Sequence, residues 1–201
     1  MDNAALFKIG YGLYLLTSYD GGKDNGCIIN TVLQVTSDPL VGVITVNKQN
    51  HTHDMIVKSK EFNVSMLTTQ TPFEVFKRFG FQSGRSTYKF AGYQDTAKSE
   101  NGLLYLTKST NAYLSFEVTD TIVFGTHTMF KANITDGKVL GEDESVTYSY
   151  YQQNIKPKPQ ATASKGYRCK TCNYVYEGDP LPNDFICPLC KHGASDFEKI
   201  I

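Results

Sequence analysis

The sequence predicts a mainly β protein, an antiparallel barrel with two or three short helices, followed by a small second domain. Most apolar residues before position 135 fall in short runs rich in Val, Ile, Thr, Tyr and Phe, which is the composition of strands. A hairpin turn, Asp20-Gly-Gly-Lys-Asp-Asn-Gly26, separates the first two runs. A polar segment with two prolines then divides these runs from a cysteine-rich end.

Six runs are predicted as strands. Each is dominated by β-branched or aromatic residues, and turn-forming residues separate several of them. The predicted strands are Leu13–Tyr19, Cys27–Val35, Leu40–Val46, Phe62–Leu67, Ala112–Val118 and Val123–Ile134.

Two segments have a helical pattern. Thr52–Lys60 places Met55, Ile56 and Ser59 on one side. Thr71–Phe79 begins with a predicted threonine cap, has Pro72 at the expected first helical position, and carries Glu74 in the first turn. No apolar stretch reaches the length that a membrane-spanning helix requires, so we expect no membrane association.

Composition divides the chain into three parts. Residues 1–151 are expected to form the larger domain, residues 152–165 a linker, and residues 166–201 a small domain. Pro157 and Pro159 deny backbone donors and bias the linker to extended conformations. The small domain could hardly bury a core unaided, so we expect a metal to stabilise it.

Four of the five cysteines form two Cys-x-x-Cys pairs in this small domain, Cys169 with Cys172 and Cys187 with Cys190. Two facing pairs supply four thiolates in a tetrahedron, which suits zinc or a single iron. Two disulfides are the alternative. The N-terminus, MDNAALFKIG, lacks a secretory signal pattern, so a reduced cytoplasmic thiol cluster is favoured.

The residues around these cysteines resemble rubredoxin, a one-iron electron carrier, over residues 166–200. The gap between the pairs is short, as in the C-terminal module of rubrerythrins, and Phe185 and Lys191 replace the usual tryptophan and glycine. The resemblance implies iron, while a structural zinc knuckle remains the alternative because both metals accept four thiolates. The shared features are Tyr167, Tyr174, Tyr176, Gly178-Asp-Pro180, Pro188 and Phe197.

The larger domain also resembles a family. Five blocks in order, "YGLYLLTSYDGGKDNGCIINTVLQVTSDP", "VNKQNHTHDMI", "EFNVSML", "RFGFQSGRSTYKF" and "GTHTMF", are similar to the flavin reductase-like FMN-binding split barrel. The resemblance implies a homodimer that binds FMN near the subunit interface, with NAD(P)H approaching the exposed flavin face. The fusion to a short rubredoxin module resembles the high-molecular-weight rubredoxin type of anaerobic bacteria.

Candidate flavin contacts lie at a predicted strand end before Asp38-Pro39. They are Asn30, Thr31, Gln34, Val35 and Thr36. Such a strand end presents backbone N–H groups and short hydroxyls to a ring edge, and the family places the isoalloxazine there. Ordinary polar turn chemistry before a proline is the alternative.

A candidate anion site lies between a predicted strand and helix, where first-turn N–H groups and the helix dipole favour a phosphate. Asp54 competes for the same positive end, and Asn50 or Thr52 could instead cap the helix. Arg85, in Ser83-Gly-Arg, could bind phosphate or the nicotinamide pyrophosphate, or be a solvated surface residue. The candidates in the first segment are Asn47, Lys48, Asn50, Thr52 and His53.

A histidine, a lone cysteine and a group of tyrosines are further features of the first domain. His127 matches the position of a histidine near flavin or nicotinamide in the family, with a hydrogen-bonded core histidine as the alternative. Cys27 is predicted to be a small apolar core residue. Tyr148, Tyr150 and Tyr151 are expected to pack a strand or a dimer contact.

These features predict an electron-transfer oxidoreductase. FMN accepts hydride from NAD(P)H and releases single electrons, which a one-iron centre requires. No acid or base is needed for hydride transfer, so no catalytic residue is assigned, and no Gly-x-Gly-x-x-Gly marks a Rossmann domain. Twenty basic against twenty acidic residues give no field to attract nucleic acid. The resemblance implies a flavodiiron or rubrerythrin-type acceptor. Free-flavin reduction, or a flavin protein with a zinc ribbon, is the alternative.

Overall fold

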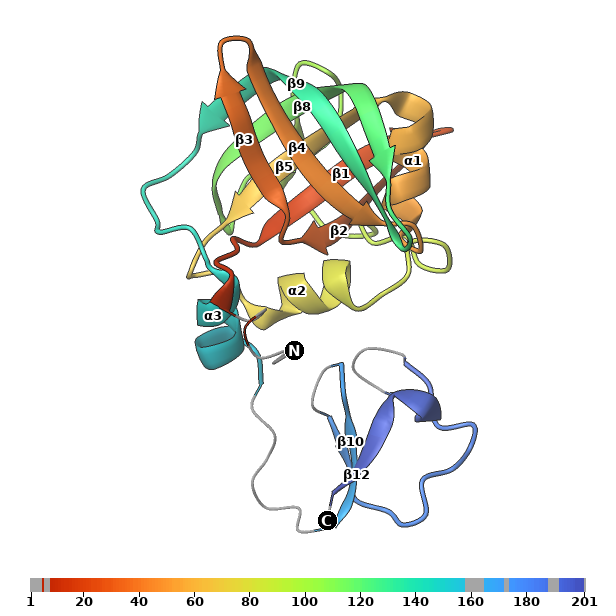
Figure 1. The fold of residues 1–201 in the computed structure, drawn as a ribbon. Coiled ribbons are helices and arrows are strands. Elements are labelled where there is room, and N and C mark those ends of the chain that lie inside the picture. The colour runs from red at the N-terminus through yellow and green to blue at the C-terminus, as the bar shows by residue number, and fades with distance from the viewer. Residues whose placement is uncertain (1–4, 6–7, 158–164, 172–173, 188–191, 201) are drawn as a thin grey trace.

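The computed structural model describes residues 5, 8–157, 165–171, 174–187 and 192–200. A seven-stranded antiparallel sheet forms most of the first part, and a three-stranded sheet forms the C-terminal part (Figure 1). The predicted fold class is confirmed: the chain is mainly β, with a few short helices and a small C-terminal β domain.

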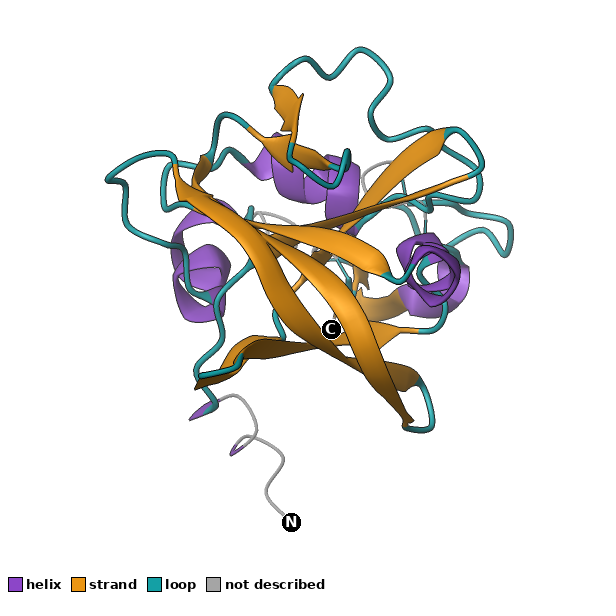
Figure 2. Ribbon diagram, turned by 90° about the horizontal axis from the view of Figure 1, so that it is seen from above, coloured by secondary structure: helices purple, strands orange, loops and turns teal. Residues whose placement is uncertain are grey.

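The large sheet has the order β2-β1-β5-β8-β9-β4-β3, and every neighbouring pair is antiparallel. Its two edge strands, β2 and β3, follow each other in the chain, so the curled sheet is a barrel that is split between consecutive strands (Figures 1 and 2). The strands are β1 (Tyr14–Asp20), β2 (Lys23–Ile29), β3 (Val32–Ser37), β4 (Leu40–Asn47), β5 (Glu61–Leu67), β8 (Thr110–Val123) and β9 (His127–Val139). A separate hairpin pairs β6 (Thr96–Lys98) with β7 (Leu104–Leu106).

The barrel interior is one apolar cluster to which strands β1, β2, β4, β5, β8 and β9 contribute. Alternation along each strand sends every second side chain inward. Phe62 and Phe116 stack at the centre with ring centroids 4.7 Å apart, and both are almost fully buried. Ile56 of helix α1 closes one side of the same cluster. The apolar spacing in the sequence therefore predicts which faces are buried.

Strand boundaries differ from the prediction in several places. Strand β2 begins at Lys23, inside the predicted turn, and β8 and β9 both run beyond the predicted ends. The run Cys27–Val35 was predicted as one strand, but it is divided at residues 30 and 31 between β2 and β3. The run Val123–Ile134 spans the turn between β8 and β9, since β8 ends at Val123 and β9 starts at His127. Asn30 and Gly125 are the turn-forming residues at these two breaks, and the apolar residues on either side of each made the run look continuous.

Two helices flank the barrel, and each was predicted (Figure 2). Helix α1 (His51–Ser59) ends at Lys60, whose φ of 62° gives the left-handed cap. Helix α2 (Phe73–Gly80) buries Val75, Phe76 and Phe79. None of the described helices is both long enough and apolar enough to cross a bilayer.

The start of α2 corrects the sequence prediction. Pro72 is extended and precedes the helix, so it is not the first helical residue, and no side chain caps this end. The Thr71 hydroxyl instead donates to the Ser109 carbonyl at 2.9 Å and accepts from the Thr68 amide at 3.0 Å. Thr71 therefore links the residues before α2 to Ser109, which directly precedes β8, and it does not cap the helix.

The tyrosines near residue 150 lie on helices, not on a strand. Helix α3 (Tyr148–Tyr150) leads directly into a π-helical turn, η2 (Tyr151–Ile155). Tyr151 is buried and packs on Phe76 of α2 with ring centroids 4.5 Å apart. The first residues of the segment expected to be linker are thus helical and packed on the barrel domain.

The C-terminal domain is a small sheet of order β11-β10-β12. Its strands are β10 (Gly166–Cys169), β11 (Val175–Tyr176) and β12 (Phe197–Ile200), with a short 3₁₀ turn, η3 (Ala194–Asp196), before the last. Cys169, Cys187 and Phe197 form its buried centre, and aromatic residues surround them. Phe185 meets Phe197 edge-on at 5.3 Å between centroids.

Candidate functional site

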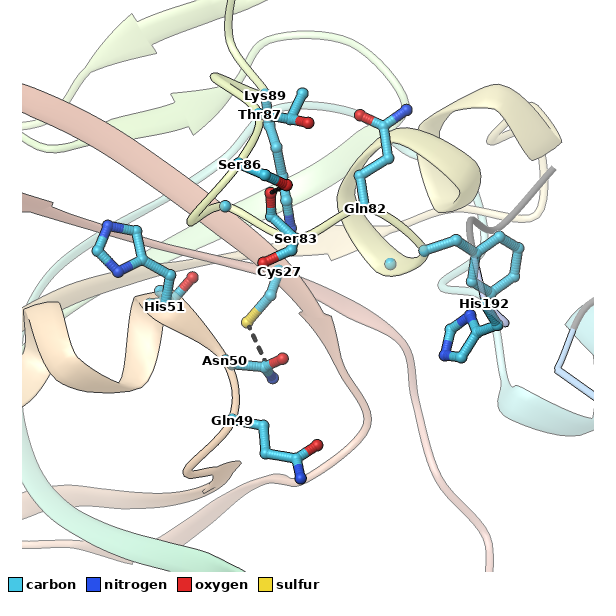
Figure 3. Close-up of a pocket in the computed structure, with 14 residues that line it drawn as sticks. Cys27, Gln49, Asn50, His51, Gln82, Ser83, Ser86, Thr87, Lys89 and His192 are labelled. Atoms are coloured by element: carbon cyan, nitrogen blue, oxygen red, sulfur yellow. Dashed lines mark hydrogen bonds between the residues drawn. The ribbon is translucent and has the colours of Figure 1, made fainter. Parts of the chain in front are cut away.

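The main cavity of the barrel domain has a volume of about 580 Å³ and lies between the start of α1 and the loop that follows α2 (Figure 3). Strand β2 contributes Cys27 to its floor, and residues 49–52 of the β4–α1 junction form one wall. The opposite wall is the loop after α2, with Gln82, Ser83, Gly84, Ser86 and Thr87, and Lys89 lies behind that loop. This size accommodates a flavin-sized ligand, since small-molecule sites span about 300–1,000 Å³.

The N-terminus of α1 opens into this cavity. Asn50 is the N-cap residue in an extended conformation, and its side chain makes no capping hydrogen bond. Its amide nitrogen lies 3.7 Å from the Cys27 sulfur, inside the cavity (Figure 3). Because the cap is not satisfied by its own side chain, the first-turn N–H groups are available for an anion.

Lys89 is a buried cation in the cavity wall. It is only 4% exposed, and its ammonium donates to the carbonyl oxygens of Gly26 and Phe79, each at 2.9 Å. Among the described residues no carboxylate pairs with it. Burial lowers the pKa of Lys89, while the nearby Cys27 raises it. A buried cation without an acidic partner favours an anionic ligand.

The loop after α2 adds short hydroxyl groups. Ser83 organises it, because its carbonyl accepts from the Ser86 and Thr87 amides and its hydroxyl accepts from the Arg85 amide. A side chain at Gly84 would collide with the Asn25 amide, so this loop can approach β2 closely only with glycine there. Hydroxyls, a helix N-terminus and a buried lysine around one cavity fit a phosphate-bearing cofactor.

Arg85 and Asp54 pair beside this cavity. The Arg85 guanidinium lies 2.7 Å from the Asp54 carboxylate, whose other oxygen lies 3.1 Å from the His53 ring. Partial burial raises the pKa of Asp54, but hydrogen bonds from His53 and Arg85 outweigh it and lower that pKa overall. Asp54 is therefore an anion with two partners, which weakens the objection that it competes with phosphate at the helix N-terminus.

The predicted anion-site residues are only partly brought together. Asn50 and Thr52 line the cavity, and Thr52 is fully buried, accepting from the Asn25 amide at 2.9 Å. His53 points away and contacts Thr128 at 2.9 Å. The Asn47 and Lys48 side chains bond to the Gln49 amide and the Gly125 carbonyl, and Arg85 lines an adjoining cavity of about 170 Å³.

The predicted flavin contacts on β3 do not line the main cavity of the single chain. Thr31 donates to the Thr45 carbonyl at 2.7 Å, and Thr36 bonds locally with Asp38. A bulge lies between Gln34 and Thr36, and Val35 is 58% exposed. Asn30 sits half-buried in the two-residue connection before β3. Because β3 is an edge strand, its outer side chains face away from the chain's own interior.

His127 is not a buried core histidine. It begins β9, is half-buried, and its Nδ1 lies 2.8 Å from the Thr126 hydroxyl. The next residue, Thr128, is the buried one and contacts His53. His127 does not line the main cavity of the single chain, so its role as a flavin or nicotinamide contact stays a prediction.

Most residues of the cavity, including the Ser83, Ser86 and Thr87 hydroxyls, were not recognised as site residues from the sequence. Cys27 is buried in the core, as predicted, and burial raises its pKa, yet it also forms the cavity floor. Lys89 was not singled out at all. The sequence did contain an indication, because Lys89 stands between the aromatic residues Tyr88 and Phe90. A lysine in such an apolar segment is rarely buried without a partner, so its burial there points to a function.

The candidate metal centre is described in part. Cys169 and Cys187 are both fully buried, and their backbone amides donate to the carbonyls of Tyr174 and His192, each at 2.8 Å. Cys172 and Cys190 lie outside the described residues, so the four-sulfur set stays a prediction. Buried sulfurs within an aromatic shell fit an iron–thiolate centre and also a zinc knuckle.

Comparison with known proteins gives two family matches along the chain. Residues 6–158 match the flavin reductase like domain, and residues 167–198 match the rubrerythrin, rubredoxin-like domain. The chain is 40% identical to the high molecular weight rubredoxin of Moorella thermoacetica over the full length of both. It is 37% identical to the ferric-chelate reductase (NAD(P)H) of Archaeoglobus fulgidus, over 85% of this chain and all of that one.

Solved structures show the same fold. The NADH:FAD oxidoreductase of Streptomyces globisporus C-1027 superimposes with a TM-score of 0.65 at 19% identity, covering 74% of this chain and 90% of that chain.

Proposed function

Because the chain belongs to the flavin reductase-like family and carries a rubredoxin-like domain at its C-terminus, we propose that it carries electrons from NAD(P)H through bound FMN to an iron centre. The proposed iron ligands are Cys169, Cys172, Cys187 and Cys190. We assign residues 1–151 to the flavin domain, 152–165 to the linker and 166–201 to the iron domain. One observation carries the proposal: His192 of the cysteine-rich domain lines the cavity of the flavin domain (Figure 3).

The protein holds its cofactors, and they supply the redox chemistry. FMN, when bound, takes two electrons as hydride from nicotinamide and gives them up singly, while iron held by four thiolates accepts one electron at a time. The chain's own task is to hold both groups, exclude water and set their potentials. No described side chain has to act as acid or base for this.

We assign the phosphate of FMN to the cavity wall. The first-turn N–H groups of α1 and the Ser83, Ser86 and Thr87 hydroxyls would bind its oxygens. Lys89 would supply positive charge from behind the loop. Arg85, beside this cavity and half-exposed, remains available to the pyrophosphate of a nicotinamide dinucleotide, since Asp54 engages only one side of its guanidinium fork.

A homodimer is supported by an exposed apolar surface. The exposed large apolar side chains of β3, the start of β4, the β8–β9 turn and the end of β9 are together called the apolar face below. Solvent exposure at 43–70% is costly for so many large apolar side chains on one sheet, and such surfaces usually mark an interface. Residues 30–36 and His127 would then contact flavin only in the assembled dimer. The apolar face consists of Leu33, Val35, Leu40, Ile122, Val123, Phe124 and Val139.

The names of two related proteins support a nicotinamide nucleotide as the electron donor. The Archaeoglobus relative is named as an NAD(P)H enzyme and the Streptomyces structure as an NADH enzyme, so we assign a nicotinamide donor here. We place the protein in the cytoplasm. A flavodiiron or rubrerythrin-type protein is the proposed acceptor, following the resemblance to rubredoxin-containing electron carriers.

Anaerobic stopped-flow spectroscopy tests the function. Mixing the FMN- and iron-loaded protein with NADH should bleach the flavin absorbance first and the ferric–thiolate absorbance second. Flavin that turns over as a freely dissociating substrate, with no change of the iron colour, would show a free-flavin reductase instead. Metal analysis of protein from its native host that finds zinc in place of iron would also contradict the proposal.

A further inference from the structure

Phe81 connects the two domains. It follows the last residue of α2, and its backbone amide donates to the Lys77 carbonyl at 3.2 Å, which fixes its position at the helix end. Its half-buried ring packs against the apolar cluster formed by Cys169, Cys187 and Phe197 of the C-terminal domain. No other residue of the described barrel domain belongs to that cluster.

Residues next to both cysteine pairs lie beside Phe81. Thr171, two positions after Cys169, shares with Phe81, Tyr151 and Gln152 the lining of a cavity of about 270 Å³. On the other side, His192 and Phe81 both line the main cavity (Figure 3). The His192 carbonyl accepts from the Cys187 amide at 2.8 Å, so the segment that reaches the cavity is bonded directly to a predicted metal ligand.

The same ring therefore borders the main cavity and packs against the cluster that contains the buried cysteines. We propose that Phe81 is the docking residue through which the C-terminal domain binds the barrel of its own chain. The occupant of this surface is the chain's own segment 166–200. The consequence for electron flow rests on the function proposed above: the docked state places the cysteine cluster at the cavity mouth, so delivery runs within one chain.

The small size of the contact between the two domains predicts that docking is reversible. A contact centred on one aromatic ring is far smaller than the area that stable interfaces bury, so the docked state exchanges with an undocked one. Docking then depends strongly on the area that Phe81 contributes. Removing the ring should lower the docked-to-undocked ratio about tenfold, since partial burial of a phenylalanine corresponds to roughly that factor.

Small-angle X-ray scattering of the full-length, cofactor-loaded protein tests docking without any turnover. Phe81→Ala should increase the radius of gyration, and Phe81→Leu, which keeps an apolar side chain, should increase it much less. Tyr19→Ala is the matched control, because Tyr19 is a 40% exposed aromatic residue on β1 and belongs to neither the cavity nor the cysteine cluster. An unchanged radius of gyration in Phe81→Ala would overturn the proposal.

Stopped-flow traces measure the consequence for electron delivery. In Phe81→Ala the ratio of the iron-bleaching rate to the flavin-bleaching rate should fall in proportion to the docked fraction, at most about tenfold. Both rates come from the same trace, so any effect of the substitution on the rate of flavin reduction is measured directly and does not distort the ratio. If the wild type shows no iron bleaching at all, the proposed function fails, while the scattering result still decides docking.

Co-expression separates docking within one chain from docking on a partner subunit. A Phe81→Ala chain is combined with a Cys172→Ser chain, which keeps Phe81 but lacks one predicted ligand. Docking within the chain predicts only the slow iron phase of the Phe81→Ala chain. A fast phase in the mixed dimer would show that a module reaches the Phe81 of the partner subunit and would overturn docking within the chain.

Discussion

The Lys89 ammonium donates to the carbonyl oxygen of Phe79 at 2.9 Å, which joins a buried cation to the last turn of helix α2. The same ammonium reaches Gly26 of β2, 63 positions away in the chain. A cation at a helix C-terminus is favourable because it meets the negative end of the helix dipole. This arrangement keeps a positive charge in the cavity wall without an acidic partner.

Replacing this lysine should destabilise the apoprotein. Lys89→Met keeps the length of the side chain but leaves two buried carbonyl groups without their donor, at a cost of about 1–3 kcal/mol. Chemical denaturation at neutral pH measures the difference. Lys138→Met, an exposed lysine on β9, is the control and should change stability by less than about 0.5 kcal/mol.

The wild type and Lys89→Met should also differ in how their folding stability depends on pH. Burial lowers the pKa of Lys89, so the unfolded chain holds more protons between the folded pKa and the unfolded value of 10.5. Stability of the wild type should therefore rise relative to Lys89→Met as the pH increases through that interval. A difference that is constant with pH would mean that the Lys89 pKa is not lowered.

A negative charge at the start of α1 should weaken FMN binding. Asn50→Asp preserves the size of the N-cap side chain but places a carboxylate inside the cavity, where it repels phosphate by about 1–3 kcal/mol, or roughly ten- to hundredfold in affinity. Calorimetric titration of the apoprotein with FMN gives the affinity. Gln153→Glu, the same kind of change on the exposed side of η2, should bind FMN like the wild type. Equal affinities would place the phosphate elsewhere.

Loss of one predicted metal ligand should interrupt electron delivery after the flavin. Cys172→Ser is expected to abolish reduction of an external protein acceptor, while NADH still bleaches the flavin. Iron content and the two bleaching phases are measured on the same sample. Lys170→Arg, an exposed position within the same Cys-x-x-Cys segment, is the control. Acceptor reduction that survives in Cys172→Ser would exclude the route through iron.

A charge on the apolar face should disrupt the proposed homodimer. Val35→Lys places an ammonium on exposed edge strand β3, where it would be buried in an interface without a partner. Light scattering coupled to gel filtration should show a monomer or a strongly weakened dimer. Val57→Lys, an equally apolar but separate exposed position on α1, should leave the assembly unchanged. A wild type that is itself monomeric would contradict the dimer directly.

The sequence was informative wherever a signal is local. Most strand-like runs and both helical segments appear near their predicted places because period and turn chemistry act over a few residues. The turn predicted over Asp20–Gly26 is shorter, since Asp20 already pairs with Lys23. It was less informative at short breaks inside apolar runs, such as Asn30-Thr31, where one strand ends and the next begins at the opposite edge of the sheet. The choice of Thr71 as a cap failed because its hydroxyl is used by Ser109, a contact across the fold that no local pattern reports.

The cavity residues also divide into those that a local sequence pattern predicts and those that depend on contacts across the fold. Asn50 and Thr52 were predicted because they lie at the start of a helix, and they line the cavity. Arg85 was predicted for anions, but it pairs with Asp54, so its position depends on a partner 31 residues away. The predicted contacts at residues 30–36 lie on or just before edge strand β3, and His127 is the first residue of β9. The surroundings of both places depend on what covers them in the assembled protein.

The sequence alone determined that this protein has an antiparallel barrel, because strand-like runs follow one another along the first 135 residues. It also determined the paired-cysteine domain, because each Cys-x-x-Cys spacing forms one short turn. Only the tertiary structure decided that Lys89 lies buried in the cavity wall and that Phe81 touches the cysteine cluster. Those roles depend on groups distant in sequence that folding brings within a few ångströms, and a linear pattern contains no record of such distances.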